Sequence, residues 1–128
     1  MAFQKVLLKG QSLAAYSEKR LLPSLEVGKW DRLHFHISGG SGGVEGLSVR
    51  ILFGTPVDGK ILLTDSTVWF EETVSEREFS FTTPSTYNGT GFVMSVPVVA
   101  PLLYDVILKN LSPNEKPELY VTLMAQEI

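Results

Sequence analysis

Two histidines separated by one residue are the side chains in this sequence with the clearest capacity for chemistry. His34 and His36 flank Phe35 in the stretch DRLHFHISGGSGGVEG, which covers residues 31–46. Residues i and i+2 of a β-strand point to the same face, so a strand here would offer both imidazoles to one metal ion. A catalytic zinc or iron site needs a third protein ligand. Because the chain has no other histidine and no cysteine, that ligand would have to be Asp or Glu.

The spacing around these histidines resembles part of a known family pattern. Gly28, followed after five residues by His34 and then His36, is similar to the opening of the first cupin motif. Gly91, followed after five residues by Pro97, begins like the second cupin motif. The resemblance implies a jelly-roll fold. As an alternative function, it implies a degenerate cupin-like, metal-dependent protein that uses His34 and His36.

The chain departs from the cupin pattern at the remaining ligand positions. Cupins have a Glu three or four residues after the second histidine, where this chain has Gly40 and Ser41. The first Glu is Glu45, beyond the glycine run. Val99 stands where the second motif has glycine, and no histidine follows it. The resemblance therefore favours the fold more than the metal centre.

The glycine run at 39–43 does not match a phosphate-binding loop. A P-loop ends in Gly-Lys-Ser/Thr, and no lysine occurs between Lys29 and Lys60. Glu45 stands where a dinucleotide loop starting at Gly40 would need its last glycine. The run precedes LSVRILF, which alternates with the period of a strand. We interpret it as a flexible hairpin connection.

No complete catalytic set is present in the sequence. A G-x-S-x-G elbow is absent. Glu76 and Glu78 share a strand face opposite Phe79 and Phe81, so these carboxylates are expected to face water. We therefore expect a protein that is not an enzyme and has no cofactor.

Three aromatic residues supply a second alternative. Trp30 and Tyr87 fall in expected loops, and Trp69 lies in an alternating stretch among polar residues. If these rings cluster on the surface, they could bind a carbohydrate by stacking. They would otherwise be core residues or anchors at an interface between subunits.

Composition limits the class of protein. The chain has 128 residues, which suits one domain spanning 1–128, and 44% of them are hydrophobic. The net charge is −3 and no lysine or arginine cluster exceeds Lys19-Arg20, which argues against nucleic acid and anionic membranes as partners. We find no signal peptide and no apolar run of transmembrane length, and there is no cysteine. These features predict a soluble, cytoplasmic protein.

Period-two alternation predicts an all-β fold. We expect strands at 2–9, 32–38, 46–53, 60–64, 67–74, 76–82, 91–99, 102–109 and 118–126. Residues 12–22 are expected to form a loop and an edge strand, and Asn88-Gly89 is a strong hairpin signal. Asn110-Leu111-Ser112 matches a glycosylation triplet, but we interpret Asn110 as a turn residue. Eight to ten strands of this spacing predict an antiparallel β-sandwich of jelly-roll or Greek-key type.

The strands at 91–99 and 102–109 are apolar on both faces. Either they lie centrally between two covered layers, or a second subunit covers their outer face. This pattern favours a homo-oligomer. The leading functional hypothesis is a non-enzymatic binding or assembly module that acts through a homo-oligomeric surface. A carbohydrate or small-molecule ligand is a further possibility.

Overall fold

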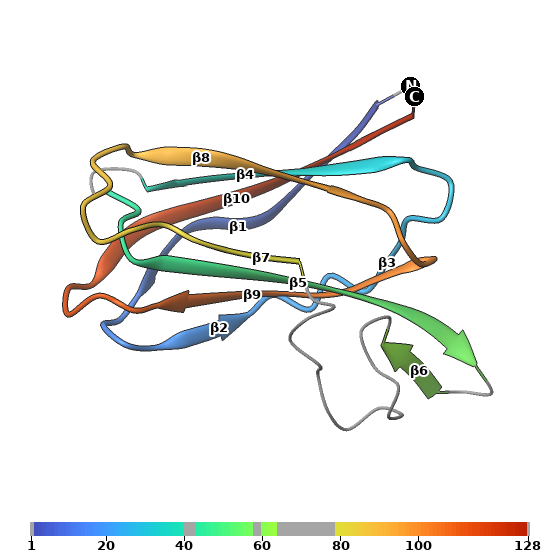
Figure 1. Ribbon diagram of the computed structural model, residues 1–128, viewed down its shortest axis with the longest axis horizontal. Coiled ribbons are helices and arrows are strands. Elements are labelled where there is room, and N and C mark those ends of the chain that lie inside the picture. The colour runs from blue at the N-terminus through green and yellow to red at the C-terminus, as the bar shows by residue number, and fades with distance from the viewer. Residues whose placement is uncertain (1, 40–42, 58–59, 64–78, 128) are drawn as a thin grey trace.

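The computed structural model describes residues 2–39, 43–57, 60–63 and 79–127 (Figure 1). Two antiparallel sheets pack together, and none of the residues described lies in a helix. The all-β class expected from the alternation is therefore confirmed. No helix in this part of the chain is long and apolar enough to cross a membrane.

Four strands form the first sheet, named sheet A. They lie in the order β1, β10, β4 and β8, and every neighbouring pair is antiparallel. Register from β10 through β4 to β8 is continuous, whereas β1 has three irregularities against β10. Within the described residues, β1 and β8 are the edges of this sheet. The bounds are β1 Ala2–Leu13, β10 Lys116–Gln126, β4 Arg32–Gly39 and β8 Gly91–Pro97.

The second sheet, named sheet B, has two long central strands and short strands along both of their outer sides. Strand β9 (Leu102–Asn110) pairs with β5 (Leu47–Val57). On its other side, β9 pairs with β2 (Glu18–Arg20) and then β3 (Leu25–Glu26). The free side of β5 pairs with β6 (Lys60–Leu63) and β7 (Phe79–Thr82).

The core lies between the two sheets and follows the alternation of their strands. In β4, Leu33, Phe35 and Ile37 are fully buried, as the sequence predicted. Sheet B supplies an equivalent layer of buried side chains from β5 and β9, including Val49, Ile51, Phe53, Leu103, Val106 and Leu108. Burying large apolar side chains from both sheets is the main force that holds the sheets together.

Two connections that the sequence marked as hairpins instead pass from one sheet to the other. The glycine run follows β4 in sheet A and leads to β5 in sheet B. Asn88-Gly89 lies between β7 in sheet B and β8 in sheet A. The hairpin interpretation was wrong at both places. Local turn chemistry predicts that the chain reverses, but the packing of the two sheets decides which strand pairs next.

Other local expectations agree with the structure except at the end of β1. Residues 14–17 form a turn, and β2 follows as an edge strand of sheet B, as expected. Strand β1 runs to Leu13 and not to residue 9, so Ser12 and Leu13, expected in the loop, lie in a strand. Leu22, before Pro23, has a φ of 42° and is not helical. The expected strand at 67–74 and the stretch 76–78 lie outside the described residues.

Strand β9 is buried on both sides within a single chain. Asp105 and Ile107, on its outer side, are 0% and 5% exposed. On this side, Arg20 Nε from β2 and the Leu22 amide both donate to the Asp105 carboxylate. The burial of Asp105 and Ile107 exists within the single chain, so residues 102–109 do not by themselves require a second subunit.

Candidate functional site

Both histidines lie on the outer face of sheet A. His34 is half-buried and His36 is exposed, on the side of β4 opposite its core residues. The placement follows from the alternation, because Leu33, Phe35 and Ile37 must face the core. Sequence reasoning predicted this orientation correctly.

Both ring nitrogens of His34 have hydrogen-bond partners. Nδ1 is 2.7 Å from Oγ of Ser95, and Nε2 is 2.8 Å from Oε1 of Gln126. Since the amide oxygen of Gln126 is an acceptor, Nε2 carries the proton in this assignment and the neutral ring accepts from the Ser95 hydroxyl at Nδ1. His34 is thereby held as part of the sheet surface, with no lone pair left for a metal in this arrangement.

The residues beside His36 offer no further metal ligand. It lies opposite Thr122 on β10 and Val93 on β8. No group of three or more His, Cys, Asp or Glu that could hold a metal occurs in the described parts of the chain. A two-histidine site without a third protein ligand is not a typical zinc or iron centre. The structure brings His34 and His36 to one face, but places no carboxylate between them.

The outer face of sheet A carries little charge where its strands pair in regular register; two further exposed charged residues of this sheet, Lys9 and Glu118, lie where β1 and β10 pair irregularly. Cross-strand partners share a face, so the registers of the four strands define its members. Only Arg32 among them carries a formal charge at neutral pH. The face consists of Gln4, Val6, Arg32, His34, His36, Ser38, Gly91, Val93, Ser95, Pro97, Tyr120, Thr122, Met124 and Gln126.

The outer face of sheet B has the opposite character. Its cross-strand rows contain three basic and three acidic side chains. The pKa of the Arg20 guanidinium is raised, chiefly by its hydrogen bond to the buried Asp105 carboxylate. The two sides of the molecule therefore differ in what they can bind. The charged residues in the rows of this face are Glu18, Arg20, Glu26, Arg50, Asp105 and Lys109.

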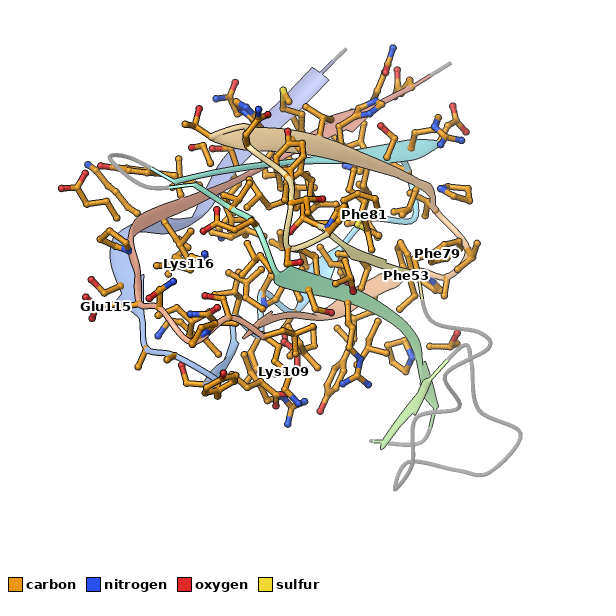
Figure 2. The ribbon with its side chains drawn as sticks, turned by 60° about the vertical axis from the view of Figure 1, so that its left-hand side comes forward. Phe53, Phe79, Phe81, Lys109, Glu115 and Lys116 are labelled. Atoms are coloured by element: carbon orange, nitrogen blue, oxygen red, sulfur yellow. The ribbon has the colours of Figure 1, made fainter. Side chains whose placement is uncertain are left out.

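An apolar groove lies along the seam between β7 of sheet B and β8 of sheet A. It is lined by Phe79, Phe81 and residues 92–96. The rings of Phe81 and Phe92 are tilted with centroids 5.2 Å apart, and Phe79 packs edge-on against Phe53 (Figure 2). Phe81 remains 44% exposed. Sequence reasoning missed this groove, although residues 79–104 contain no charged side chain, which was a visible signal.

The three aromatic residues proposed for carbohydrate binding do not share one surface. Trp30 is 6% exposed and packs in the core with Phe3 stacked on it. Tyr87 is half-buried and donates its hydroxyl hydrogen to the Gly91 carbonyl. Trp30 precedes β4, whereas Gly91 pairs with the far end of β4, so the two rings lie at opposite ends of the strand. Trp69 lies outside the described residues.

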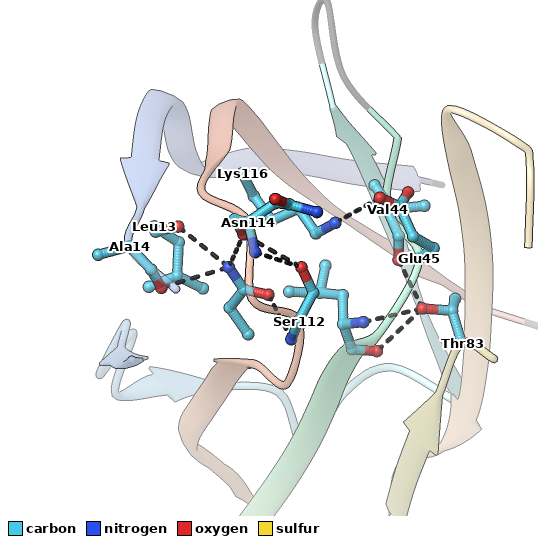
Figure 3. Close-up of polar contacts among 10 residues, drawn as sticks. Leu13, Ala14, Val44, Glu45, Thr83, Ser112, Asn114 and Lys116 are labelled. Carbon is cyan, nitrogen blue, oxygen red and sulfur yellow. Dashed lines mark hydrogen bonds and ion pairs between the residues drawn. The ribbon is translucent and has the colours of Figure 1, made fainter. Parts of the chain in front are cut away.

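A polar network closes the end of the molecule where β9 turns into β10 (Figure 3). Asn110 Nδ2 donates to the carbonyls of Leu13, Ala14 and Asn114, and its Oδ1 accepts from the Ser112 amide. The last contact is an Asx-turn, so Asn110 has the turn role expected from the sequence. Because Asn110 is fully buried, the network is structural and is not a ligand site.

A buried lysine lies at the same end. Lys116 Nζ is 2.7 Å from Oε1 of Glu45, which comes from the connection between β4 and β5. The hydrogen bond from Lys116 lowers the pKa of the Glu45 carboxyl. Sequence reasoning missed this pair. A lysine between prolines gives no signal that its side chain turns inward.

Comparison with known proteins adds no assignment, because no family model and no curated protein sequence matches this chain. Function is therefore inferred from the geometry of the described residues.

Proposed function

We propose that this protein is a non-catalytic assembly module that associates with copies of itself through the side formed by sheet A. The cysteine-free sequence is compatible with a reducing compartment, and we place its action in the cytoplasm. Its function on this view lies in a contact surface, and the two histidines are part of that surface.

The observation that carries the proposal is the difference in charge between the two outer faces. Interface centres are depleted of charged residues relative to the remaining protein surface. A symmetric contact places a surface patch against its own copy, so like charges in that patch would repel. Among the regularly paired residues of its outer face, sheet A has Arg32 as its one formal charge, and its exposed apolar residues include Val6 and Val93. The face of sheet B, with six charged residues in its rows, lacks this property.

The strand order supports a β-sandwich of jelly-roll type as the scaffold. If β2 and β3 count as one interrupted edge strand, and β6 and β7 as another, each sheet has four strand positions. The chain changes sheet between β1 and β2, β3 and β4, β4 and β5, β7 and β8, β8 and β9, and β9 and β10. Repeated crossing of this kind is what a double Greek-key winding produces. Such a scaffold leaves strand edges that need protection or pairing.

Light scattering combined with size-exclusion chromatography tests the proposal. The chain has a mass of 14.1 kDa, so self-association gives a multiple of that mass which rises with concentration toward a fixed limit. A mass of 14.1 kDa that stays constant up to the highest concentration reached would overturn the proposal.

A further inference from the structure

We propose that strand β8 pairs with β8 of a second copy, antiparallel and about a two-fold axis at Met94, and so joins two copies of sheet A into one continuous sheet. This inference rests on the proposed self-association through sheet A, and it places the contact along one edge of that sheet and not over its outer face.

The direction of each backbone group along β8 follows from two hydrogen bonds at its ends. The Val98 amide donates to the Asp31 carbonyl, and the Thr90 carbonyl accepts from the Gly39 amide. In an antiparallel pair, residues alternate between bonding the partner strand and pointing away from it. The register between β4 and β8 has no interruption, so the even-numbered residues from 90 to 98 bond β4. Gly91, Val93, Ser95 and Pro97 therefore point their backbone groups outward.

The two ends of this outward edge are already blocked. The Tyr87 hydroxyl donates to the Gly91 carbonyl at 2.6 Å. Pro97 has no amide hydrogen, and a proline is tolerated on the outer edge of a strand for this reason. Between them, the amides and carbonyls of Val93 and Ser95 have no hydrogen-bond partner among the described residues.

The pattern of open and blocked groups is complementary to itself. With Met94 on the two-fold axis, Val93 lies opposite Ser95 of the partner copy, and each such pair exchanges two hydrogen bonds. Gly91 lies opposite Pro97 of the partner copy. The Gly91 carbonyl, which already accepts from the Tyr87 hydroxyl, thus faces Pro97 of the partner copy, which has no amide hydrogen to donate. No donor or acceptor is left facing an incompatible group, which favours a second copy over an unrelated strand.

The side chains beside the edge agree with the same occupant. A strand added at β8 projects alternate side chains toward the apolar groove of Phe79 and Phe81. In this register those side chains are Phe92, Met94 and Val96 of the partner copy, which are apolar. No charged residue occurs between positions 79 and 104, so the contact brings no like charges together. Natural edge strands are often protected from such pairing by a charge, a bulge or a proline; of these three features, β8 has only Pro97, at one end.

A proline at position 93 tests the hydrogen bonds of the edge. Val93→Pro removes an outward amide and leaves the bonds from β8 to β4 in place. The matched control, Val93→Thr, keeps the amide and the branched shape. In sedimentation equilibrium we expect at least a tenfold rise in the dimer dissociation constant for Val93→Pro, and a change below about threefold for Val93→Thr. Equal dissociation constants for the two folded variants would overturn the inference.

A single cysteine at position 94 tests the register. Met94 and its copy would form a non-hydrogen-bonded pair, whose Cα atoms are about 4.5 Å apart, within the range for a disulfide. The native chain has no cysteine, so Met94→Cys gives one thiol per chain. We expect mild oxidation to yield a covalent dimer of Met94→Cys and to leave the Val6→Cys control, on the opposite edge of sheet A, monomeric in denaturing electrophoresis. Cross-linking of Val6→Cys alone would contradict the inference.

Two further variants separate the failure of this inference from the failure of the proposed function. His36→Glu places a charge in the middle of the outer face of sheet A, and Thr82→Glu places the same charge on sheet B. Edge pairing predicts a dimer that tolerates both. A dimer dissociated by His36→Glu but not by Val93→Pro would overturn the edge contact and support self-association by stacked faces. A native chain that is monomeric would overturn both proposals.

Discussion

The ammonium group of Lys116 lies 2.7 Å from Oε1 of Glu45, and the lysine side chain is 3% exposed while the glutamate side chain is 32% exposed. The pair joins the start of β10 to the connection between the two sheets. The lysine is the partner that is removed from water. The Glu45 carboxylate therefore stabilises the fold by compensating the buried positive charge of Lys116.

Replacing this carboxylate by an amide is expected to destabilise the fold. Glu45→Gln leaves the ammonium of Lys116 with a neutral acceptor, and we expect a loss of about 1–3 kcal/mol in the free energy of unfolding at pH 7. Urea denaturation measures this change in the free energy of unfolding. The exposed neighbour Glu115 provides a control, because Glu115→Gln should change stability by less than about 0.5 kcal/mol. Equal effects of the two substitutions would show that the pair has no structural role.

The same pair makes stability depend on acid pH. The hydrogen bond from Lys116 holds the pKa of Glu45 below its ordinary value, so the folded state binds this proton less readily than the unfolded state. The stabilisation is therefore complete above the unfolded pKa of about 4.3 and is lost as the pH falls through the lower, folded pKa. We expect the difference in stability between the native chain and Glu45→Gln to be constant from pH 6 to 8 and to shrink below about pH 4. A difference that grows in acid would contradict this sign.

Asn110 is expected to be a sensitive position of the polar network. Its amide nitrogen faces three backbone carbonyls, and its oxygen accepts from the Ser112 amide. Asn110→Asp keeps the size but turns a donor toward those carbonyls into an acceptor. We expect a loss of about 2–4 kcal/mol, larger than for Asn110→Ser, measured by thermal unfolding. An aspartate variant as stable as the native chain would mean that the network can re-form around a carboxylate.

The sequence predicted those features that depend on local alternation. The burial of Leu33, Phe35 and Ile37, and the outward placement of His34 and His36, follow from the period of two alone. The pairing of strands does not follow from it. Asn88-Gly89 favours a tight reversal, yet the strands on either side of it belong to different sheets, because burial of both apolar faces decides the pairing.

The candidate site was only partly predictable for a related reason. Val93 looked like one member of a strand buried on both faces, whereas it is 58% exposed at a sheet edge. Ile107 carried the same apolar signal and is 5% exposed within the single chain. Sequence patterns report how apolar a face is, but not whether the chain itself covers that face.

The predicted metal site leads to a direct binding test. His34 has both ring nitrogens in hydrogen bonds, and His36 has no acidic neighbour in its cross-strand row. We therefore expect zinc or nickel at 100 μM to shift the melting temperature of the purified chain by less than about 1 °C, since a ligand stabilises only when it binds the folded state. His36→Ala serves as the control. A larger rise that His36→Ala abolishes would instead support the cupin-like alternative.

Asp105 offers a test of how far a partly exposed arginine stabilises a buried carboxylate. Asp105 is fully buried, whereas the Arg20 side chain is 49% exposed, so solvent screens much of the attraction between them. The carboxylate also accepts from the amide of Leu22, whose φ of 42° is costly for a residue with a side chain. Removing Arg20 leaves the buried carboxylate with the Leu22 amide as its one donor among the described residues, while Asp105→Asn removes the charge and keeps an acceptor for Leu22. We therefore expect Arg20→Gln to lower the free energy of unfolding by about 1–2 kcal/mol. In a double-mutant cycle, the variant that combines Arg20→Gln with Asp105→Asn should lose less stability than the sum of the two single changes, with a coupling energy of about 1 kcal/mol. Strict additivity would mean that the Leu22 amide alone compensates the buried carboxylate, and that the ion pair adds nothing to stability.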